Sequence, residues 1–382
     1  MPPMLPAAPD GAVRLADVLP SCLASLESEP NVLGLPPARA AIVVLVDGLG
    51  ASNIKSRAGH ARFLASRLGR RDIAIGHFPS TTAAGIASLT TGTPPGQHGL
   101  VGYSTLDTEA DRIVNQLNGW DHGLLGPEWQ RSETVFERAA AQGVTSFAVG
   151  LPRYATSGLT GAILRGAEYV IAGTLTERFA EAERLASTGG RAIIYVYVAE
   201  LDVIAHASGW ESSRWTSTLE TLDSELASLD ARLPRDVGLI VTADHGILDV
   251  PAHKHVFLDR DPGLLVGVRH VGGEPRCRYL YLEPELDDAG RAALLDAWRT
   301  AEGHRAWVFS RDEAIDAGLF GDVDPAVAPR IGDIVIAARS GIAYYDGRDP
   351  NVQSHGMVGQ HGSLSDEETR LPLIRGGAYR RD

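Results

Sequence analysis

The stretch AAIVVLVDGLG, residues 40–50, decides the fold class of this chain. Its run of apolar, largely β-branched residues is typical of a strand buried on both faces, as in a parallel sheet covered by helices. The run ends in Asp47, and open parallel sheets bind their ligands at the carboxyl ends of the strands. An Asp after a strand is also a common turn residue. The stretch therefore predicts a central buried strand that ends at a candidate functional loop.

The same pattern recurs three times, in TSFAVG (145–150), RAIIYVYVAELD (191–202) and VGLIVTADHG (237–246). Each of these runs follows a stretch with helical periodicity. The helical stretches lie at residues 132–143, 174–187 and 213–233. Strands that alternate with helices predict a doubly wound α/β fold, with a mostly parallel sheet and helices on both faces.

Two parts of the chain depart from this rhythm. Residues 1–38 are rich in Pro and Ala and predict an arm packed on the surface, with a short helix at 19–26. Residues 253–330 predict a small inserted α+β cap, with strands at 262–271, 276–284 and 305–309 and helices at 287–301 and 310–318. The apolar run at 332–341 predicts a return to the core, which would then comprise residues 39–252 and 331–382.

The composition excludes several classes of protein. The net charge is −13 and no stretch is dense in Lys or Arg, which argues against binding of polymeric nucleic acid. A small anionic substrate remains compatible with this charge if metal ions supply positive charge locally. Cys22 and Cys277 are too few and too far apart for a disulfide framework. With no signal-peptide pattern and no membrane-spanning apolar run, we expect a cytoplasmic protein.

A cluster of hydroxyl residues precedes a helix-compatible run in HFPSTTAAGIASLTTG, residues 77–92. Ser80, Thr81 or Thr82 at the start of a helix could be a nucleophile, because the helix N-terminus attracts an incoming anion. The same residue types also cap helices routinely. This segment alone favours the cap.

Asp202 and His206 follow the strand-like run AIIYVYV at the spacing i, i+4. In a helix both side chains project from one face. A carboxylate and an imidazole on one helix face suit zinc or another divalent metal. A surface Asp–His pair is the simpler alternative, but the position after a buried strand makes it less convincing.

Asp244 and His245 are adjacent at the end of another apolar run, in TADHG. Adjacent side chains diverge in a regular strand, so both could reach one metal only in irregular backbone, which Gly246 permits. His361 lies between glycines in the loop sequence GQHG. His253, His255 and His355 are nearby histidines without such a context.

Taken in order, these segments resemble the ligand pattern of the alkaline phosphatase superfamily, and within it the type I phosphodiesterase/nucleotide pyrophosphatase family. The segments are VDGLG, FPSTTAAGIASLTTGTPPGQHGL, ELDVIAH, TADHG and GQHG. Each is weak alone, but five in the right order make a strong joint signal. The resemblance implies an alkaline-phosphatase-like core and two divalent metal ions, usually zinc in this family. The ligands that it implies are Asp202, His206 and His361 for one ion, and Asp47, Asp244 and His245, with Thr82, for the other.

The resemblance also implies the chemistry. Thr82 would be the nucleophile, because it falls on the family's nucleophile position, and a phosphothreonine would be hydrolysed by water. The expected substrate is a small phosphodiester or pyrophosphate, with nucleotides among the candidates. The chain departs from related pyrophosphatases and phosphonoacetate hydrolases at Gly85, where they carry Asn, which limits any transfer of substrate specificity.

Three alternatives stay open from the sequence. A phosphomonoesterase would need an extra positive group, for which Arg153 is a candidate, although a surface role is simpler for this residue. A phosphonate hydrolase could use the same site. A catalytically silent metal-binding module on the same fold would be expected to lack a ligand or the nucleophile. The sequence argues against a sulfatase, because no Cys-x-Pro-x-Arg stands at the nucleophile position.

Overall fold

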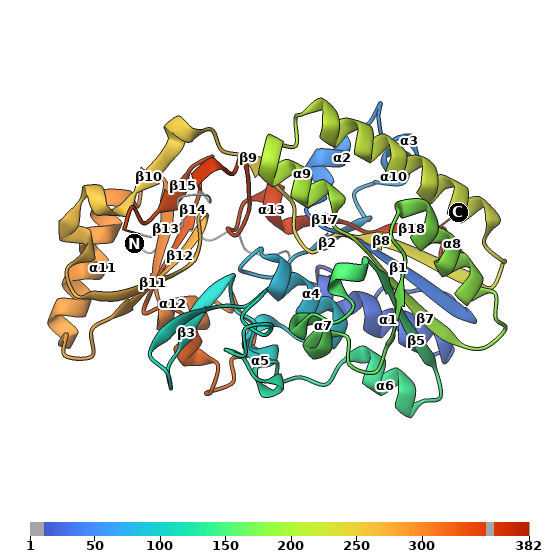
Figure 1. Cartoon of the computed structure of the whole chain (residues 1–382), viewed down its shortest axis with the longest axis horizontal. Helices are drawn as coiled ribbons and strands as arrows, with labels where there is room; N and C mark the ends of the chain where they lie inside the picture. Colours follow the sequence, from blue (N-terminus) through green and yellow to red (C-terminus); the bar gives the residue numbers. More distant parts are fainter. Residues whose placement is uncertain (1–10, 349–354, 382) are drawn as a thin grey trace.

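A six-stranded sheet forms the centre of the larger part of the molecule (Figure 1). The computed structural model describes residues 11–348 and 355–381. All neighbouring strands of this sheet are parallel except the edge strand β18, which runs antiparallel to β8. The strand order is β18 (Ile374–Gly377), β8 (Val237–Thr242), β1 (Ala40–Val46), β7 (Ala192–Val198), β5 (Thr145–Gly150) and β6 (Glu168–Ile171). The predicted α/β fold with a mostly parallel sheet is confirmed.

Helices cover both faces of this sheet, which explains why β1 is buried along its whole length. On one face α8 packs on β7, β5 and β1, and α10 packs on α8. On the other face α1 packs on β1 and β7, and α6 packs on β5. Their bounds are α1 (Val18–Leu26), α6 (Val135–Ala141), α8 (Leu175–Ala186) and α10 (Ser213–Arg232).

Helix α9 (Glu200–Ser208) begins directly after β7, and a buried arginine fixes this junction. Arg178, on α8, is fully buried. It donates a hydrogen bond to the carbonyl oxygen of Tyr197 at 2.6 Å and pairs with Glu200. Because one side chain holds both the end of β7 and the start of α9, residues on α9 are presented rigidly at the carboxyl end of the sheet.

The smaller part of the molecule contains a four-stranded antiparallel sheet. Its strands follow the order β11 (Val268–Glu274), β12 (Cys277–Leu282), β14 (Ile334–Ala338) and β13 (Ala306–Ser310). The helices α11 (Asp288–Glu302) and α12 (Arg311–Asp316) pack against β13. Residues 262–265, which we expected to begin a strand, form the 3-10 helix η6 (Pro262–Leu265) instead.

The run at 332–341 does not return to the large sheet as we expected, because its strand β14 pairs with β12 and β13. The side chains of β14 alternate between two hydrophobic clusters. Val335 and Ala337 face one of them, and Ile334, Ile336 and Ala338 face the other. A strand covered on both faces has the same apolar sequence in either sheet, so the sequence alone could not assign it.

Four two-stranded sheets and several short helices complete the described part of the fold. The strand pairs are β2 (Ile73–Ile75) with β17 (Arg370–Pro372), β3 (Ser104–Asp107) with β4 (Arg112–Asn115), β9 (Leu248–Asp249) with β16 (Gly359–Gln360), and β10 (His255–Phe257) with β15 (Ala343–Tyr345). The remaining α-helices are α2 (Ala51–Ser56), α3 (Arg62–Ser66), α4 (Thr82–Thr91), α5 (Pro95–His98), α7 (Gly158–Ile163) and α13 (Asp366–Thr369). Among the described residues, no helix combines the length and apolar character that a bilayer crossing requires.

The N-terminal helix belongs to the core. We expected residues 1–38 to lie on the surface as an arm, of which residues 1–10 fall outside the described part. The helix α1 instead buries most of its residues in the main hydrophobic cluster, together with β1. Its apolar sequence VLPSCLASL covers a face of the sheet that would otherwise meet water.

We expect Leu19→Ala to lower the free energy of unfolding by about 2–5 kcal/mol, because Leu19 is 0% exposed and its loss leaves a cavity. Val32→Ala, in the same N-terminal segment, is the control, since Val32 is 68% exposed. Urea denaturation measures both variants. If both substitutions change the free energy of unfolding by equally small amounts, the segment is a surface arm and not part of the core.

Candidate active site

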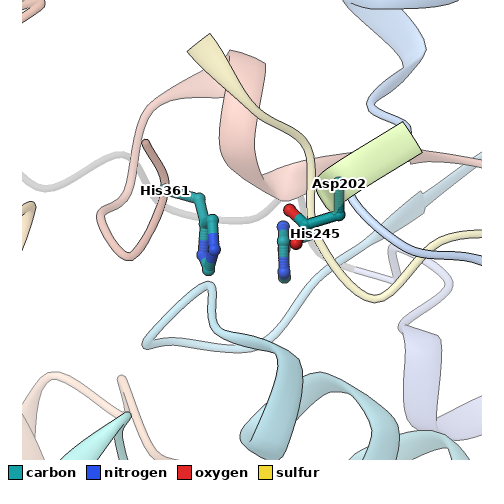
Figure 2. A group of neighbouring side chains, drawn as sticks. All are labelled: Asp202, His245 and His361. Carbon is teal, nitrogen blue, oxygen red and sulfur yellow. The ribbon is translucent and has the colours of Figure 1, made fainter. Parts of the chain in front are cut away.

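The candidate site lies where three neighbouring strands of the large sheet end. Asp47 follows β1, Asp202 lies on α9 just after β7, and Asp244 and His245 follow β8. Because β7, β1 and β8 are adjacent and parallel, their carboxyl ends meet at one edge of the sheet. His361 joins them from the loop after β16, and Figure 2 shows Asp202, His245 and His361 side by side, each from a different segment.

Asp47, Asp244 and His245 form the first cluster of candidate metal ligands. The Nε2 atom of His245 lies 3.3 Å from Oδ1 of Asp47 and 3.7 Å from Oδ2 of Asp244. All three side chains are buried. The hydroxyl of Tyr197 donates a hydrogen bond to Oδ2 of Asp47, which leaves Oδ1 facing the cluster.

Asp202, His206 and His361 lie beside the first cluster. Nε2 of His206 is 3.3 Å from Oδ2 of Asp202 and 3.2 Å from Nε2 of His361. The Nδ1 atoms of the two histidines each lie 2.8 Å from a carbonyl oxygen, that of Gly359 for His206 and that of Ser80 for His361. A carbonyl only accepts, so both Nδ1 atoms carry the proton and the two Nε2 lone pairs face each other. Two neutral imidazoles in this arrangement repel each other, so the contact favours a cation at this point, either a proton on one Nε2 or a metal ion.

The structure also groups the ligands in a way that the sequence did not suggest. Asp202, His245 and His361 offer ligand atoms that all lie within 4.8 Å of one another, so His245 belongs to both clusters. The rings of His245 and His361 stack with centroids 3.6 Å apart. The two candidate metal positions are therefore neighbours.

Burial and mutual repulsion shift the ionisation of the carboxyl groups. Burial raises the pKa of Asp47 well above its usual value, and the charges of Asp244 and Asp202 raise it further. Burial likewise raises the pKa of Asp244, with Asp202 adding to the effect and His245 opposing it. Burial also acts to raise the pKa of Asp202, but His206, with smaller contributions from His361 and His245, outweighs burial, and the pKa is lowered.

The two histidines of the second cluster shift in opposite directions. Burial lowers the pKa of His361 well below its usual value, and the nearby His245 and His206 lower it further. His361 is thus held neutral, as a metal ligand must be. Burial also acts to lower the pKa of His206, but the charge and hydrogen bond of Asp202 and the hydrogen bond to the Gly359 carbonyl together outweigh it and raise the pKa.

The donor set fits divalent metal ions. Within the described parts of the chain, Oδ1 of Asp47, Oδ1 of Asp202 and Oδ2 of Asp244 are buried and have no hydrogen-bond partner. Buried carboxylate oxygens without partners cost several kcal/mol unless a cation approaches them. Carboxylates and imidazoles whose Nδ1 atoms donate to carbonyls are a typical ligand set for zinc.

The three hydroxyl candidates have different surroundings. Thr82 is the first residue of α4, and its Oγ1 lies 3.1 Å from Nε2 of His245. The hydroxyl of Ser80 is buried and donates to the carbonyl oxygen of Ser363 at 2.7 Å. Thr81 is the buried N-cap residue of α4. Only the Thr82 hydroxyl faces the metal-ligand clusters, next to the unpaired backbone N–H groups of the first helical turn.

Two cavities meet at Thr82 and Asp202. The first, of about 370 Å³, is largely apolar and aromatic, and we call it the tyrosine pocket because Tyr154, Tyr169, Tyr195 and Tyr197 line it. The second, of about 510 Å³, lies between the large and small sheets, and we call it the inter-sheet pocket. Its lining includes Tyr103, Asn115, Val271, Glu274, Arg278 and Gln360.

Arginine, tryptophan and histidine side chains outside the two ligand clusters have varied positions. Arg153 is exposed, as expected for a surface residue, and it also lines the tyrosine pocket, with its guanidinium over the ring of Tyr154. Trp120 packs in the main core, and Trp129 stacks under Arg330, so neither offers a platform for a ligand. His255 and His355 pack around Tyr345 away from the metal ligands.

Tyr197 is a site residue that no sequence motif indicates. It lies within an apolar strand, and its hydroxyl donates a hydrogen bond to Asp47. The available signal was a tyrosine at the carboxyl end of a strand that is otherwise largely aliphatic. Glu274, a buried carboxyl group 3.6 Å from Nδ1 of His361, had no signal in the sequence.

Two glycines near the site are explained by close packing. We expected Gly246 to provide unusual backbone geometry, but its φ lies outside the left-handed region, and a Cβ there would overlap the carbonyl oxygen of Glu367. At Gly85 a Cβ would lie 2.7 Å from the carbonyl oxygen of Asp244. A larger side chain at position 85 would require α4 or the Asp244 loop to shift, and with glycine there α4 approaches the Asp244 loop closely.

The fold and this edge of acidic and histidine side chains define an alkaline-phosphatase-like α/β protein. The chain belongs to the type I phosphodiesterase/nucleotide pyrophosphatase family, whose model matches residues 41–364. This is a family of hydrolases that act on phosphoesters. No protein with a curated description matches the chain.

Solved structures share the fold. Murine ectonucleotide pyrophosphatase/phosphodiesterase 5 superposes with a TM-score of 0.68 at 17% identity, over 88% of each chain. An inactive variant of that protein in complex with AMP gives 0.67 at 18% identity, again over 88% of each chain. Phosphonoacetate hydrolase from Sinorhizobium meliloti 1021, in complex with phosphonoformate, gives 0.66 at 20% identity, over 89% of this chain and 91% of the other.

We expect Gly246→Ala to destabilise the protein by at least about 1–3 kcal/mol, because the added methyl group displaces the chain at Glu367. Gly190→Ala is the control, since a Cβ at position 190 meets no atom within 4 Å. Thermal unfolding of both variants measures the difference. A Gly246→Ala protein as stable as the control would show that this contact relaxes freely.

Proposed function

We propose that the protein is a two-metal hydrolase that cleaves phosphodiester or nucleotide pyrophosphate bonds through a phosphothreonine on Thr82. The observation that carries this proposal is the position of the Thr82 hydroxyl. It lies at the start of a helix, 3.1 Å from Nε2 of His245 and beside two clusters of buried metal ligands. Family membership supports the same class of reaction.

The geometry supports one assignment of the residues that would hold the ions. Asp47, Asp244 and His245, with Thr82, would hold one ion, and Asp202, His206 and His361 the other. Because His245 lies close to the ligands of both ions, the two ions would be neighbours. Bound zinc ions would supply the positive charge that lowers the pKa of a hydroxyl or a water and offsets the charge of the phosphoryl group.

The chain's own residues would carry the reaction in two halves. In the first half, Oγ1 of Thr82 loses its proton and forms a bond to phosphorus, and the bond from phosphorus to the leaving oxygen breaks with its electron pair, so that the leaving oxygen takes up a proton. In the second half a water oxygen attacks the same phosphorus, and the bond to Oγ1 breaks, which regenerates the hydroxyl. The backbone N–H groups at the start of α4 face the phosphoryl oxygens in both halves.

A diester explains the two cavities better than a monoester. A diester phosphorus has two substituents, and two pockets of different chemistry meet at Thr82. The aromatic lining of the tyrosine pocket suits a planar group such as a nucleobase. The AMP bound to an inactive variant of the murine neighbour is consistent with a nucleotide substrate.

Two alternatives keep specific support. Arg153 in the tyrosine pocket is a positive group that a phosphomonoester could use. The phosphonate ligand of the Sinorhizobium meliloti neighbour keeps a phosphonate substrate open. A silent metal-binding module has no such support.

We expect zinc-loaded protein to cleave bis-p-nitrophenyl phosphate faster than p-nitrophenyl phosphate, because only the diester fills both pockets. Thr82→Ala should lower kcat by about a thousandfold or more, since it removes the nucleophile. Thr82→Ser keeps a hydroxyl and should retain measurable turnover. The release of p-nitrophenol measures the activity of the wild type and of both variants. Full activity in Thr82→Ala would refute the covalent step. Faster cleavage of the monoester would favour a phosphatase.

We also expect two zinc ions per chain by elemental analysis, and fewer in Asp202→Asn, because the amide oxygen is a weaker ligand. The exposed Asp236→Asn is the control. A chelator should lower the midpoint of thermal unfolding by several degrees, because the bound ions stabilise only the folded state. The metal assignment would be contradicted if the protein binds no zinc and the chelator leaves its midpoint of thermal unfolding unchanged.

A further inference from the structure

A buried ion pair connects the smaller sheet with the end of the chain. Arg276, in the turn before β12, and Glu368, on α13, are both 0% exposed. Nε of Arg276 donates to Oε1 of Glu368 at 2.7 Å, and one Nη2 hydrogen donates to Oε2 at 2.8 Å. This bidentate geometry is the strongest form of an arginine–carboxylate contact.

The remaining groups of the pair are also satisfied. Arg276 donates further hydrogen bonds to the carbonyl oxygens of Ser340, Ile342 and Ala338, so all five of its N–H groups are used. The carboxylate of Glu368 accepts two more, from the backbone N–H groups of Ser363 and Ser365. A fully satisfied buried pair tolerates little displacement, because any shift leaves a buried charge without a partner.

Through Ser363, this carboxylate reaches the loop that carries His361. The Ser363 carbonyl accepts from the Ser80 hydroxyl at 2.7 Å, and the Gly362 carbonyl accepts from the Ser80 backbone N–H at 3.3 Å. The Ser80 carbonyl in turn accepts from Nδ1 of His361 at 2.8 Å. The loop after His361 and the segment before Thr82 are thus joined in both directions.

The backbone of the same glutamate reaches a third loop. The carbonyl oxygen of Glu368 accepts a hydrogen bond from the backbone N–H of Gly246, next to His245, at 2.9 Å. The preceding Glu367 carbonyl packs closely against Gly246 and Gly50. Glu368 therefore contacts the His361 loop through its side chain and the His245 loop through its main chain.

We propose that Glu368, held by Arg276, is a positioning residue that sets the relative placement of His361, His245 and Thr82. The smaller sheet would thereby fix the metal centre although it contributes no metal ligand. This inference rests on the proposed function for its kinetic consequence but not for its effect on metal binding. Small displacements of ligands or nucleophile lower metal affinity and rate steeply.

The test compares two bidentate Glu–Arg pairs, of which Arg276–Glu368 is fully buried and Arg305–Glu302 has a partly exposed arginine. Glu368→Gln removes the charge at the proposed positioning residue. Glu302→Gln does the same to a glutamate that is 7% exposed, pairs with Arg305 through both carboxylate oxygens, and lies outside both pockets at Thr82. Zinc affinity is measured by competition with a chromogenic chelator, kcat and KM with bis-p-nitrophenyl phosphate, and stability by urea denaturation.

We expect Glu368→Gln to weaken zinc binding by about 10–100-fold and to lower kcat more than it raises KM. Glu302→Gln should lose stability but keep the zinc affinity of the wild type. Equal zinc affinities in the two variants would overturn the proposal. If the wild type binds zinc but cleaves neither ester, the proposed function fails, and the zinc comparison still decides this inference.

A second variant covers the case in which Glu368→Gln does not fold. Ser80→Ala removes only the hydrogen bond from the Ser80 hydroxyl to the Ser363 carbonyl, which connects the His361 loop to the segment before Thr82. It should weaken zinc binding by severalfold at a modest cost in stability. Unchanged zinc affinity in folded Ser80→Ala would refute the connection to the Thr82 segment.

Discussion

Repulsion among three buried carboxylates is the constraint on which this structure depends. Asp47, Asp202 and Asp244 are held at one edge of the sheet, each with an oxygen that no protein donor reaches in the described chain. A core cannot keep such charges together without compensation. The surroundings reduce the problem only in part, through the Tyr197 hydroxyl at Asp47 and His206 at Asp202. The rest of the architecture is consistent with a site that gains its full stability when divalent cations bind.

The sheet order explains how the charges come together. The strands β7, β1 and β8 are neighbours in space although they are far apart in sequence, so three separate strand ends deliver their residues to one point. Helix α4 then places Thr82 opposite them, and the missing side chain at Gly85 allows the close approach. The two pockets open on either side of that threonine, so its surroundings differ strongly between one flank and the other.

Much of the large sheet and the residues of the site could be predicted from sequence, because apolar runs ending in Asp or His carry both signals at once. The strands at 145–150 and 237–242 appear where the runs predicted them. The placement of β14 could not be predicted, since a strand with two buried faces gives the same sequence in either sheet. The placement of α1 in the core could not be predicted either, because its short apolar sequence does not indicate which part of the protein it packs against. The sharing of His245 and the pairing of Arg276 with Glu368 depend on contacts between distant segments, which no local pattern encodes.

The excursion of the chain into the smaller sheet has a consequence for folding. Asp47 is supplied near the beginning of the chain and His361 near its end, and the whole antiparallel sheet is made in between. Closing so long a loop is entropically costly, and contacts of this sequence separation form slowly. During synthesis the parallel strands up to β8 can assemble first. The cluster of Asp202, His206 and His361 can form only after His361 has been synthesised. The ligand set is therefore completed only after both sheets have been synthesised, so a prematurely terminated chain would lack a complete centre.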